Sequence, residues 1–212
     1  ALRRHALGVL RMLIEKALPV SLNTLIDAAW EAEKAVPGVT DHREELRQFF
    51  QDRLRVMLRD AGYTTLEVDA VLALNPEKLD ELPKRLAAVR AFMALPEAEA
   101  LTAANKRIGN ILKKIEGEVP TVVNEALLAE DAEKQLFAAI NDVEPKALQH
   151  FAAGEYEQML ATLAVLRGPV DSFFDNVMVN AEDPALRATR QALLKRLYDV
   201  MNKVAEIARL AK

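Results

Sequence analysis

Hydrophobic residues recur along this chain at the three- and four-residue spacing of α-helices, and no strand-like alternation lasts more than a few residues. The sequence also lacks the Asn-Gly and Asp-Gly pairs that are typical of tight hairpins. Ala and Leu make up most of the apolar content, which favours helix over sheet. The pattern therefore predicts an all-α fold, a helical bundle of roughly eight to ten helices.

Cap and turn residues divide this pattern into separate helices. Ser21 is expected to cap the second helix, and Asp183 followed by Pro184 to begin the last. Two pairs have capping-box spacing, Asp41 with Glu44 and Thr64 with Glu67. The expected helices are 2–17, 21–36, 42–61, 64–74, 75–95 with a bend or restart near Pro83, 96–116, 130–153, 155–166, 169–177 and 184–210.

The length of 212 residues suits one large domain or two small ones. Pro37-Gly38 and the 117–120 segment are the clearest breaks, and neither is a long flexible linker. We therefore expect 1–212 to form one region, either a single bundle or two packed sub-bundles, 1–117 and 118–212. Ala1 stands within a helical pattern and is not Met, so the chain is expected to be a fragment of a longer protein.

Several kinds of site are not expected. The chain has no cysteine, which excludes disulfides and fits a reducing compartment, and no apolar run long enough for a membrane span. The three histidines, His5, His42 and His150, lack metal-ligand spacing. There is no glycine-rich phosphate loop. We predict no catalytic residue, no metal site and no cofactor in this chain.

Residues 105–114 stand out against the net charge of −4, because they carry four positive charges and no negative one. On a helix the cationic and apolar residues separate onto two faces. The outer face, which we call the cationic stripe, comprises Lys106, Arg107, Asn110, Lys113 and Lys114. This stripe is either an ordinary solvated face or a surface that contacts phosphates.

Charge is also uneven elsewhere. Residues 116–157 hold ten acidic and two basic side chains, whereas 184–212 hold seven basic and two acidic ones. Because local charge controls phosphate binding, the overall acidity does not exclude a nucleic-acid partner.

Two arginines fall on predicted apolar faces, Arg53 near Phe49 and Arg190 near Leu193. A guanidinium in such a place needs a carboxylate or carbonyl partner, so each is either a structural ion-pair residue or a ligand contact. Arg55 and Arg59 instead project outward. The pair Phe173-Phe174 is helix-spaced, and it either packs in the core or supports base stacking.

Four segments together resemble the C-terminal region of the bacterial glycyl-tRNA synthetase beta subunit. They are Ala1–Leu10, the run Phe49-Phe50-Gln51-Asp52-Arg53-Leu54-Arg55, residues 104–114, and 169–183 with the Leu186–Leu194 stretch that follows. They occur in the family's order and span almost the whole chain. Thr189 and Gln191 depart from the Asn and Leu of the family pattern, and Gly109 replaces a bulkier residue.

The resemblance implies a helical, DALR-like anticodon-binding domain that binds glycine tRNA in the cytoplasm. It implies as partners the synthetase alpha subunit and the remainder of the beta subunit, with no membrane and no DNA. The whole enzyme would join glycine to tRNA using ATP and Mg, with the adenylation chemistry in the alpha subunit. The candidate tRNA-binding residues are Arg3, Arg4, Arg55, Arg59, Asn105, Lys106, Arg107, Asn110, Lys113 and Lys114.

A second hypothesis assigns the chain a different role. As a helical protein-interaction module, it would dock to the rest of the synthetase through the acidic segment 116–157 and the region around Trp30.

Overall fold

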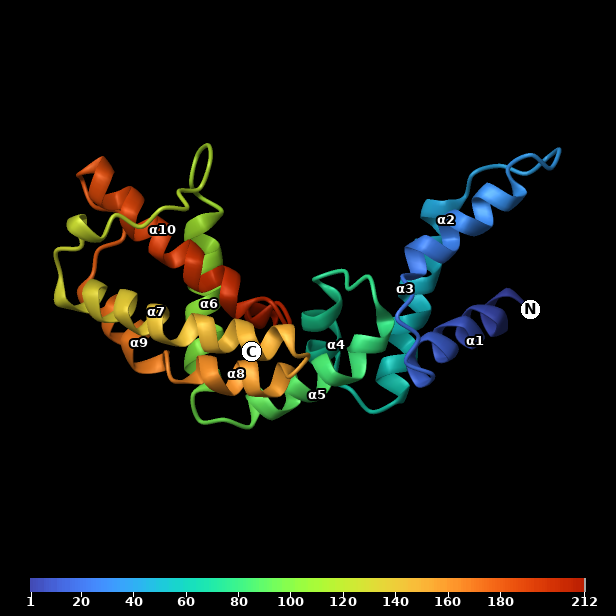
Figure 1. Ribbon diagram of the computed structural model, residues 1–212, viewed down its shortest axis with the longest axis horizontal. Helices are drawn as coiled ribbons and strands as arrows, with labels where there is room; N and C mark the ends of the chain where they lie inside the picture. Colours follow the sequence, from blue (N-terminus) through green and yellow to red (C-terminus); the bar gives the residue numbers. More distant parts are fainter. Residues whose placement is uncertain (212) are drawn as a thin grey trace. The chain divides into compact units, whose positions relative to one another are not determined.

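The computed structural model describes residues 1–211, which form α-helices, short 3-10 helices and connecting loops (Figure 1). Within that range the only β pairing is an isolated bridge between Ser21 and Lys78. The α-helices are α1 (Leu2–Glu15), α2 (Leu22–Glu33), α3 (Arg43–Asp60), α4 (Thr65–Leu72), α5 (Leu82–Met93), α6 (Ala98–Leu112), α7 (Asp131–Ala152), α8 (Tyr156–Ala164), α9 (Arg167–Asn176) and α10 (Pro184–Met201). The 3-10 helices are η1 (Leu79–Glu81), η2 (Glu125–Leu127) and η3 (Ile207–Leu210). The predicted all-α fold is confirmed.

Most of the predicted helix caps are present. Ser21 accepts a hydrogen bond from the Thr24 amide, and Asp183 accepts from the amides of Ala185 and Leu186. Thr64 and Glu67 form the full capping box, with distances of 3.2 and 2.7 Å. These residues satisfy amides that have no partner within the helix, so helix starts could be predicted from local sequence.

The box expected from Asp41 and Glu44 is wrong. The N-cap of α3 is His42, and Asp41 instead accepts hydrogen bonds from the backbone and guanidinium of Arg43. The arginine side chain holds the pKa of Asp41 at about 2.

α7 keeps its predicted range, whereas other helices are shorter than predicted, and η1 with α5 covers only Leu79–Met93 of the expected 75–95. Pro145 lies inside α7 without interrupting it. The final helix ends at Met201, and not near residue 210, because Asn202 turns the chain there. Its side chain donates to the Tyr198 carbonyl at 2.8 Å and accepts from the Ile207 amide at 2.9 Å. The residues that follow form η3, which packs on α6.

The chain forms two compact units, residues 1–86 and 87–212. The predicted division after residue 117 is therefore misplaced, because α6 packs with the helices that follow it and belongs to the second unit. In the first unit α1 packs against α3 and η1, and α3 also contacts α2 and α4. Its fully buried side chains include Leu10, Leu54, Val71 and Leu79.

The second unit is built around two helices. α6 packs against α9, α10 and η3, and α7 packs against α8, α9 and α10. Ile108, Ile140, Phe173 and Leu197 bring these helices together in a core from which water is excluded. The helix that carries most of the cationic stripe is therefore fixed along one side, and its opposite side is left to solvent.

A buried ion pair joins α7 to α10 within this unit. Arg190 is 5% exposed and Glu133 is fully buried, and the Arg190 Nε atom donates to Glu133 Oε1. Arg190 Nη1 also donates to the Met178 carbonyl at 2.6 Å. The other Glu133 oxygen accepts from the amides of Ala129 and Glu130 at 2.7 and 2.9 Å. Of the two roles expected for Arg190, the structural ion pair is confirmed.

Replacing Glu133 with Ala should destabilise the second unit strongly. The change leaves the Arg190 guanidinium buried without a counter-charge, which typically costs about 3–5 kcal/mol. Urea unfolding followed by circular dichroism measures the loss. Asp142→Ala is the matched control on the same helix, since it breaks only the exposed pair with Lys146 and should cost ~0.5 kcal/mol or less. Equal losses in the two variants would contradict the role of the buried pair.

Candidate nucleic-acid interface

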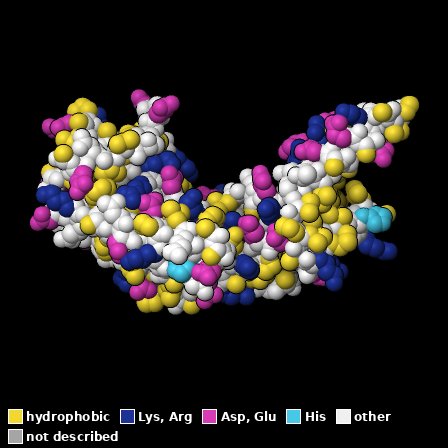
Figure 2. Space-filling view, in the orientation of Figure 1, with side chains coloured by type: hydrophobic (Ala, Val, Ile, Leu, Met, Phe, Trp, Pro, Cys, Tyr) yellow, Lys and Arg dark blue, Asp and Glu magenta, His cyan; other side chains and the backbone are white. Residues whose placement is uncertain are grey.

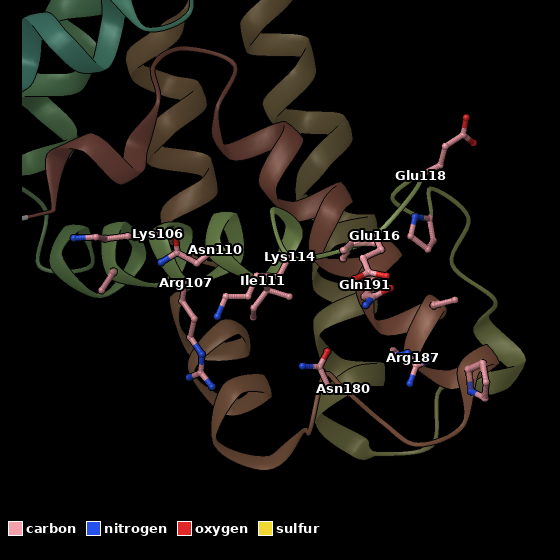
Figure 3. Close-up of a pocket in the computed structure, with 15 residues that line it drawn as sticks. Lys106, Arg107, Asn110, Ile111, Lys114, Glu116, Glu118, Asn180, Arg187 and Gln191 are labelled. Atoms are coloured by element: carbon pink, nitrogen blue, oxygen red, sulfur yellow. The ribbon is translucent and has the colours of Figure 1, made fainter.

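The second unit contains a pocket of about 870 Å³ beside the cationic stripe (Figure 3). α6, the loop after it, the segment before α10 and the first turns of α10 supply its walls. The polar and charged lining residues are Lys106, Arg107, Asn110, Lys114, Glu116, Glu118, Asn180, Arg187 and Gln191. In Figure 2, Lys and Arg side chains gather over the region where α6 and α10 meet, with acidic side chains beside them.

α6 presents the stripe as the helical pattern predicts. Leu101, Ala104 and Ile108 are buried, whereas Lys106 and Arg107 are exposed. The helix ends at Leu112, so Lys113 and Lys114 lie in the turn that follows it, and both are exposed. Lys113 is the one stripe residue that does not line the pocket.

Arg107 is held by an aromatic ring of α9. Its guanidinium carbon lies 4.3 Å from the centre of the Phe174 ring, which is partly exposed. Phe173 is fully buried and meets Phe174 edge-on, with ring centres 5.5 Å apart. Phe173 is therefore a core residue, and Phe174 supports a cation of the stripe at one edge of the pocket.

α10 contributes two polar lining residues that were not predicted, Arg187 and Gln191, spaced four positions apart. Arg187 Nη1 donates to the Ala181 carbonyl at 3.0 Å, which fixes the side chain against the preceding loop. Between them, Thr189 is buried and accepts from the Asn124 amide at 3.1 Å, so it ties the loop after α6 to α10. The i, i+4 spacing places Arg187 and Gln191 on one face of α10, and this spacing was the sequence signal that could have identified them as neighbours in the pocket.

Two carboxylates, Glu116 and Glu118, also line the pocket. Both come from the segment 116–157 that was predicted as an acidic docking surface. Other carboxylates of that segment are used internally, since Glu133 is buried and Glu144 pairs with Arg196. The acidic residues of this segment are thus distributed among different structural roles.

Asn105 does not lie on the stripe, and its expected place among the tRNA-facing residues is not supported by its position. Its side chain is fully buried, with Nδ2 4.0 Å from the Met201 sulfur and Oδ1 lacking a partner. Leu101 and Ile108, four positions before it and three after it, share this buried face. Asn105 therefore belongs to the packing between α6 and the end of α10.

Gly109 continues this face one turn later. A Cβ atom at this position would lie 3.2 Å from Cε2 of Tyr198. The absence of a side chain lets the Tyr198 ring approach α6, which gives a structural reason for the glycine at this position. Burial, with a smaller effect from Glu206, raises the pKa of the Tyr198 phenol.

The other predicted arginines lie in the first unit. Arg3, Arg4 and Arg59 are exposed, and Arg55 forms an ion pair with Asp69. Their expected contact with tRNA stays a prediction, as does that of the stripe residues.

Arg53 has no ion pair among the described residues, so the structural pair considered for it is not formed. Its guanidinium lies over the Phe49 ring at 5.5 Å, and its Nε atom is buried without an acceptor.

Within residues 1–211, no three His, Asp or Glu side chains gather where they would hold a metal ion. None of the helices described is both long and apolar enough to cross a membrane.

Two family models match the chain. One, described as the DALR anticodon binding domain, matches residues 101–208, and the other, described as the glycyl-tRNA synthetase beta subunit, matches residues 1–73. Glycine–tRNA ligase beta subunits are similar to the whole chain. That of Leptothrix cholodnii is 61% identical over 211 residues, that of Delftia acidovorans 56% over 211, and that of Thiobacillus denitrificans 54% over 212. The chain spans 29–30% of the length of these relatives.

The contact between Arg107 and Phe174 should appear as an energetic coupling. In a double-mutant cycle with Arg107→Met and Phe174→Leu, we expect a coupling of about 0.5–1 kcal/mol in urea unfolding, the usual range for an accessible cation–π pair. The same cycle with Lys106→Met and Phe174→Leu is the control and should be additive. Additivity in both cycles would show that the ring does not hold Arg107.

Proposed function

Since the chain belongs to the DALR anticodon binding domain family and matches glycyl-tRNA synthetase beta subunits along its whole length, we propose that it binds the anticodon stem and loop of glycine tRNA. The observation that carries this proposal is the pocket beside α6. Lys106 and Arg107 from α6, Lys114 from the turn after it, and Arg187 from α10 line one cavity. Such a concentration of cations attracts phosphates despite a net charge of −4.

The cations and the amides of the pocket suit different parts of an RNA strand. Backbone phosphates would contact Lys106 and Arg107, which Figure 3 shows at one end of the lining. Asn110, Asn180 and Gln191 carry amides, each both donor and acceptor, that suit the edges of unstacked bases. Phosphate contacts would position the loop, and the amides would discriminate among bases.

Glu116 and Glu118 add a negative element to this pocket. A carboxylate repels a phosphate and accepts hydrogen bonds from base amino groups. Their presence favours a base over a phosphate next to these two carboxylates, beyond Lys114 in the loop after α6.

The chain would serve a larger enzyme. We propose that it supports ATP-dependent glycylation of tRNA that is carried out in the cytoplasm with the synthetase alpha subunit, ATP and Mg being used outside this chain. In this scheme the chain supplies RNA binding and no catalytic group.

A second candidate function, docking to the remainder of the synthetase, rests on an apolar groove in the first unit. This groove, of about 460 Å³, is lined by Ile26, Trp30, Leu46 and Phe49 among others, and Arg43 lies 5.7 Å from the Trp30 ring. Exposed apolar surface of this kind is typical of a protein contact. A pull-down of the chain with tRNA and, separately, with the alpha subunit distinguishes RNA binding from protein docking.

Removal of two cations from the pocket should weaken tRNA binding and reduce its dependence on salt. For Lys106→Ala with Lys114→Ala, we expect the slope of log affinity against log salt to fall by roughly 1.4–1.8, because each lost phosphate contact contributes about 0.7–0.9. Filter binding across a salt series measures it. Lys134→Ala with Lys146→Ala is the control, since it removes equal charge from α7. Equal effects of the two double variants would show that only overall charge matters.

The base-reading role of the amides needs a separate test. Gln191→Ala should reduce discrimination between glycine tRNA and a tRNA with exchanged anticodon bases by about 1–3 kcal/mol, while leaving the salt slope unchanged. Competition binding with the two tRNAs measures the difference. If the unaltered chain binds both tRNAs equally, it contacts the backbone alone.

A further inference from the structure

A second pocket, in the first unit, lies outside the segment that matches the DALR domain. Its volume is about 550 Å³, and it lies between α1, α3 and the beginning of α5. Three arginines line it: Arg3 and Arg11 from α1, and Arg53 from α3. These three arginines have no part in the proposed anticodon site, so the ligand that they could bind is an independent question.

The helical spacing explains how the three arginines come together. Arg3 and Arg11 are eight positions apart, with Leu7 midway, so all three share one face of α1. On α3, Arg53 and Met57 are four positions apart and line the same pocket. The apolar side chains provide a floor, above which the flexible arginine heads can gather.

The part of the chain that the structure describes supplies no anionic partner to these guanidinium groups. Among residues 1–211, the side chains of Arg3, Arg11 and Arg53 make no ion pair or hydrogen bond, and the Arg53 guanidinium makes a cation–π contact with the Phe49 ring. The buried Nε atom of Arg53 lacks an acceptor. A covered donor without an acceptor typically costs about 1–3 kcal/mol, so a ligand that reorients this guanidinium and accepts from it would recover that energy.

Two carboxylates, Glu15 and Asp60, also line the pocket, but neither forms an ion pair with an arginine among the described residues. Three cations and two anions leave the lining with a surplus of one positive charge. The pocket therefore still attracts an anion, and a ligand must present its acceptors on the side of the arginines.

We propose that this pocket binds a phosphate group through Arg3, Arg11 and Arg53. A guanidinium donates through a planar fork that matches the oxygens of phosphates and carboxylates. Three guanidinium groups that line one pocket offer up to six hydrogen bonds as bidentate pairs. A carboxylate has only about four acceptor sites, whereas a phosphate offers more oxygens and more charge. The phosphate belongs either to an RNA strand or to a small phosphorylated molecule.

The test follows the Arg53 Nε–H signal by NMR during titration of the chain with inorganic phosphate at constant ionic strength. We expect a saturable shift. In the Arg3→Gln, Arg11→Gln variant, whose changes fall on exposed residues and spare the core, the dissociation constant should rise about tenfold or more. Arg4→Gln with Arg59→Gln is the matched control. These exposed arginines belong to α1 and α3, the helices that carry the three pocket arginines, and they do not line the pocket.

A shift that does not saturate, or equal dissociation constants in the two double variants, would overturn the proposal. A short single-stranded RNA then identifies the source. If it competes with inorganic phosphate at Arg53, the ligand is an RNA phosphate; if it does not, the ligand is a small phosphorylated molecule. The titration is repeated with Lys106→Ala and Lys114→Ala. Saturable phosphate binding that persists in this variant shows that the pocket is independent of the one beside α6. Each of the two proposals can therefore be refuted without the other.

Discussion

The buried ion pair between Glu133 and Arg190 sets the geometry on which the second unit depends. Glu133 accepts from Arg190 and from two amides before α7, and Arg190 also donates to the Met178 carbonyl. One pair therefore fixes the beginning of α7, the rotation of α10 and the segment between α9 and α10. With α10 held in this rotation, Arg187 and Gln191, on either side of Arg190, reach the pocket beside α6.

The position of the cationic stripe depends on α10 as well. Asn105 and Gly109 lie on the side of α6 that contacts Met201 and Tyr198, and the missing Cβ of Gly109 permits this close approach. A helix packed so firmly on one side can carry mutually repelling cations on the other, because packing offsets the repulsion. Most of the acidic residues lie elsewhere in the chain, so the pocket lining stays cationic, with four cations against the two carboxylates of Glu116 and Glu118.

Local sequence was sufficient to predict most of the helices, most of their caps and the exposed face of α6, since each depends on residues within one or two turns. It was insufficient wherever a distant residue decides the outcome. The helical pattern continues past residue 201, yet Asn202 turns the chain so that η3 packs on α6. The same limit explains the misplaced unit boundary and the missed lining residues of α10. Asn105 is a different case, because its buried neighbours at three and four positions already indicated its face.

The sequence suggested the same need for Arg53 and Arg190, because each falls on an apolar face and requires an acceptor. Arg190 finds one in Glu133, 57 positions away, whereas Arg53 finds none in the described chain. The difference depends on tertiary contacts, which the periodicity of hydrophobic residues in the sequence does not encode. A guanidinium that folding itself satisfies serves the core. One that folding leaves without an acceptor, beside two other arginines and an open cavity, is placed where an external anion can complete its hydrogen bonds.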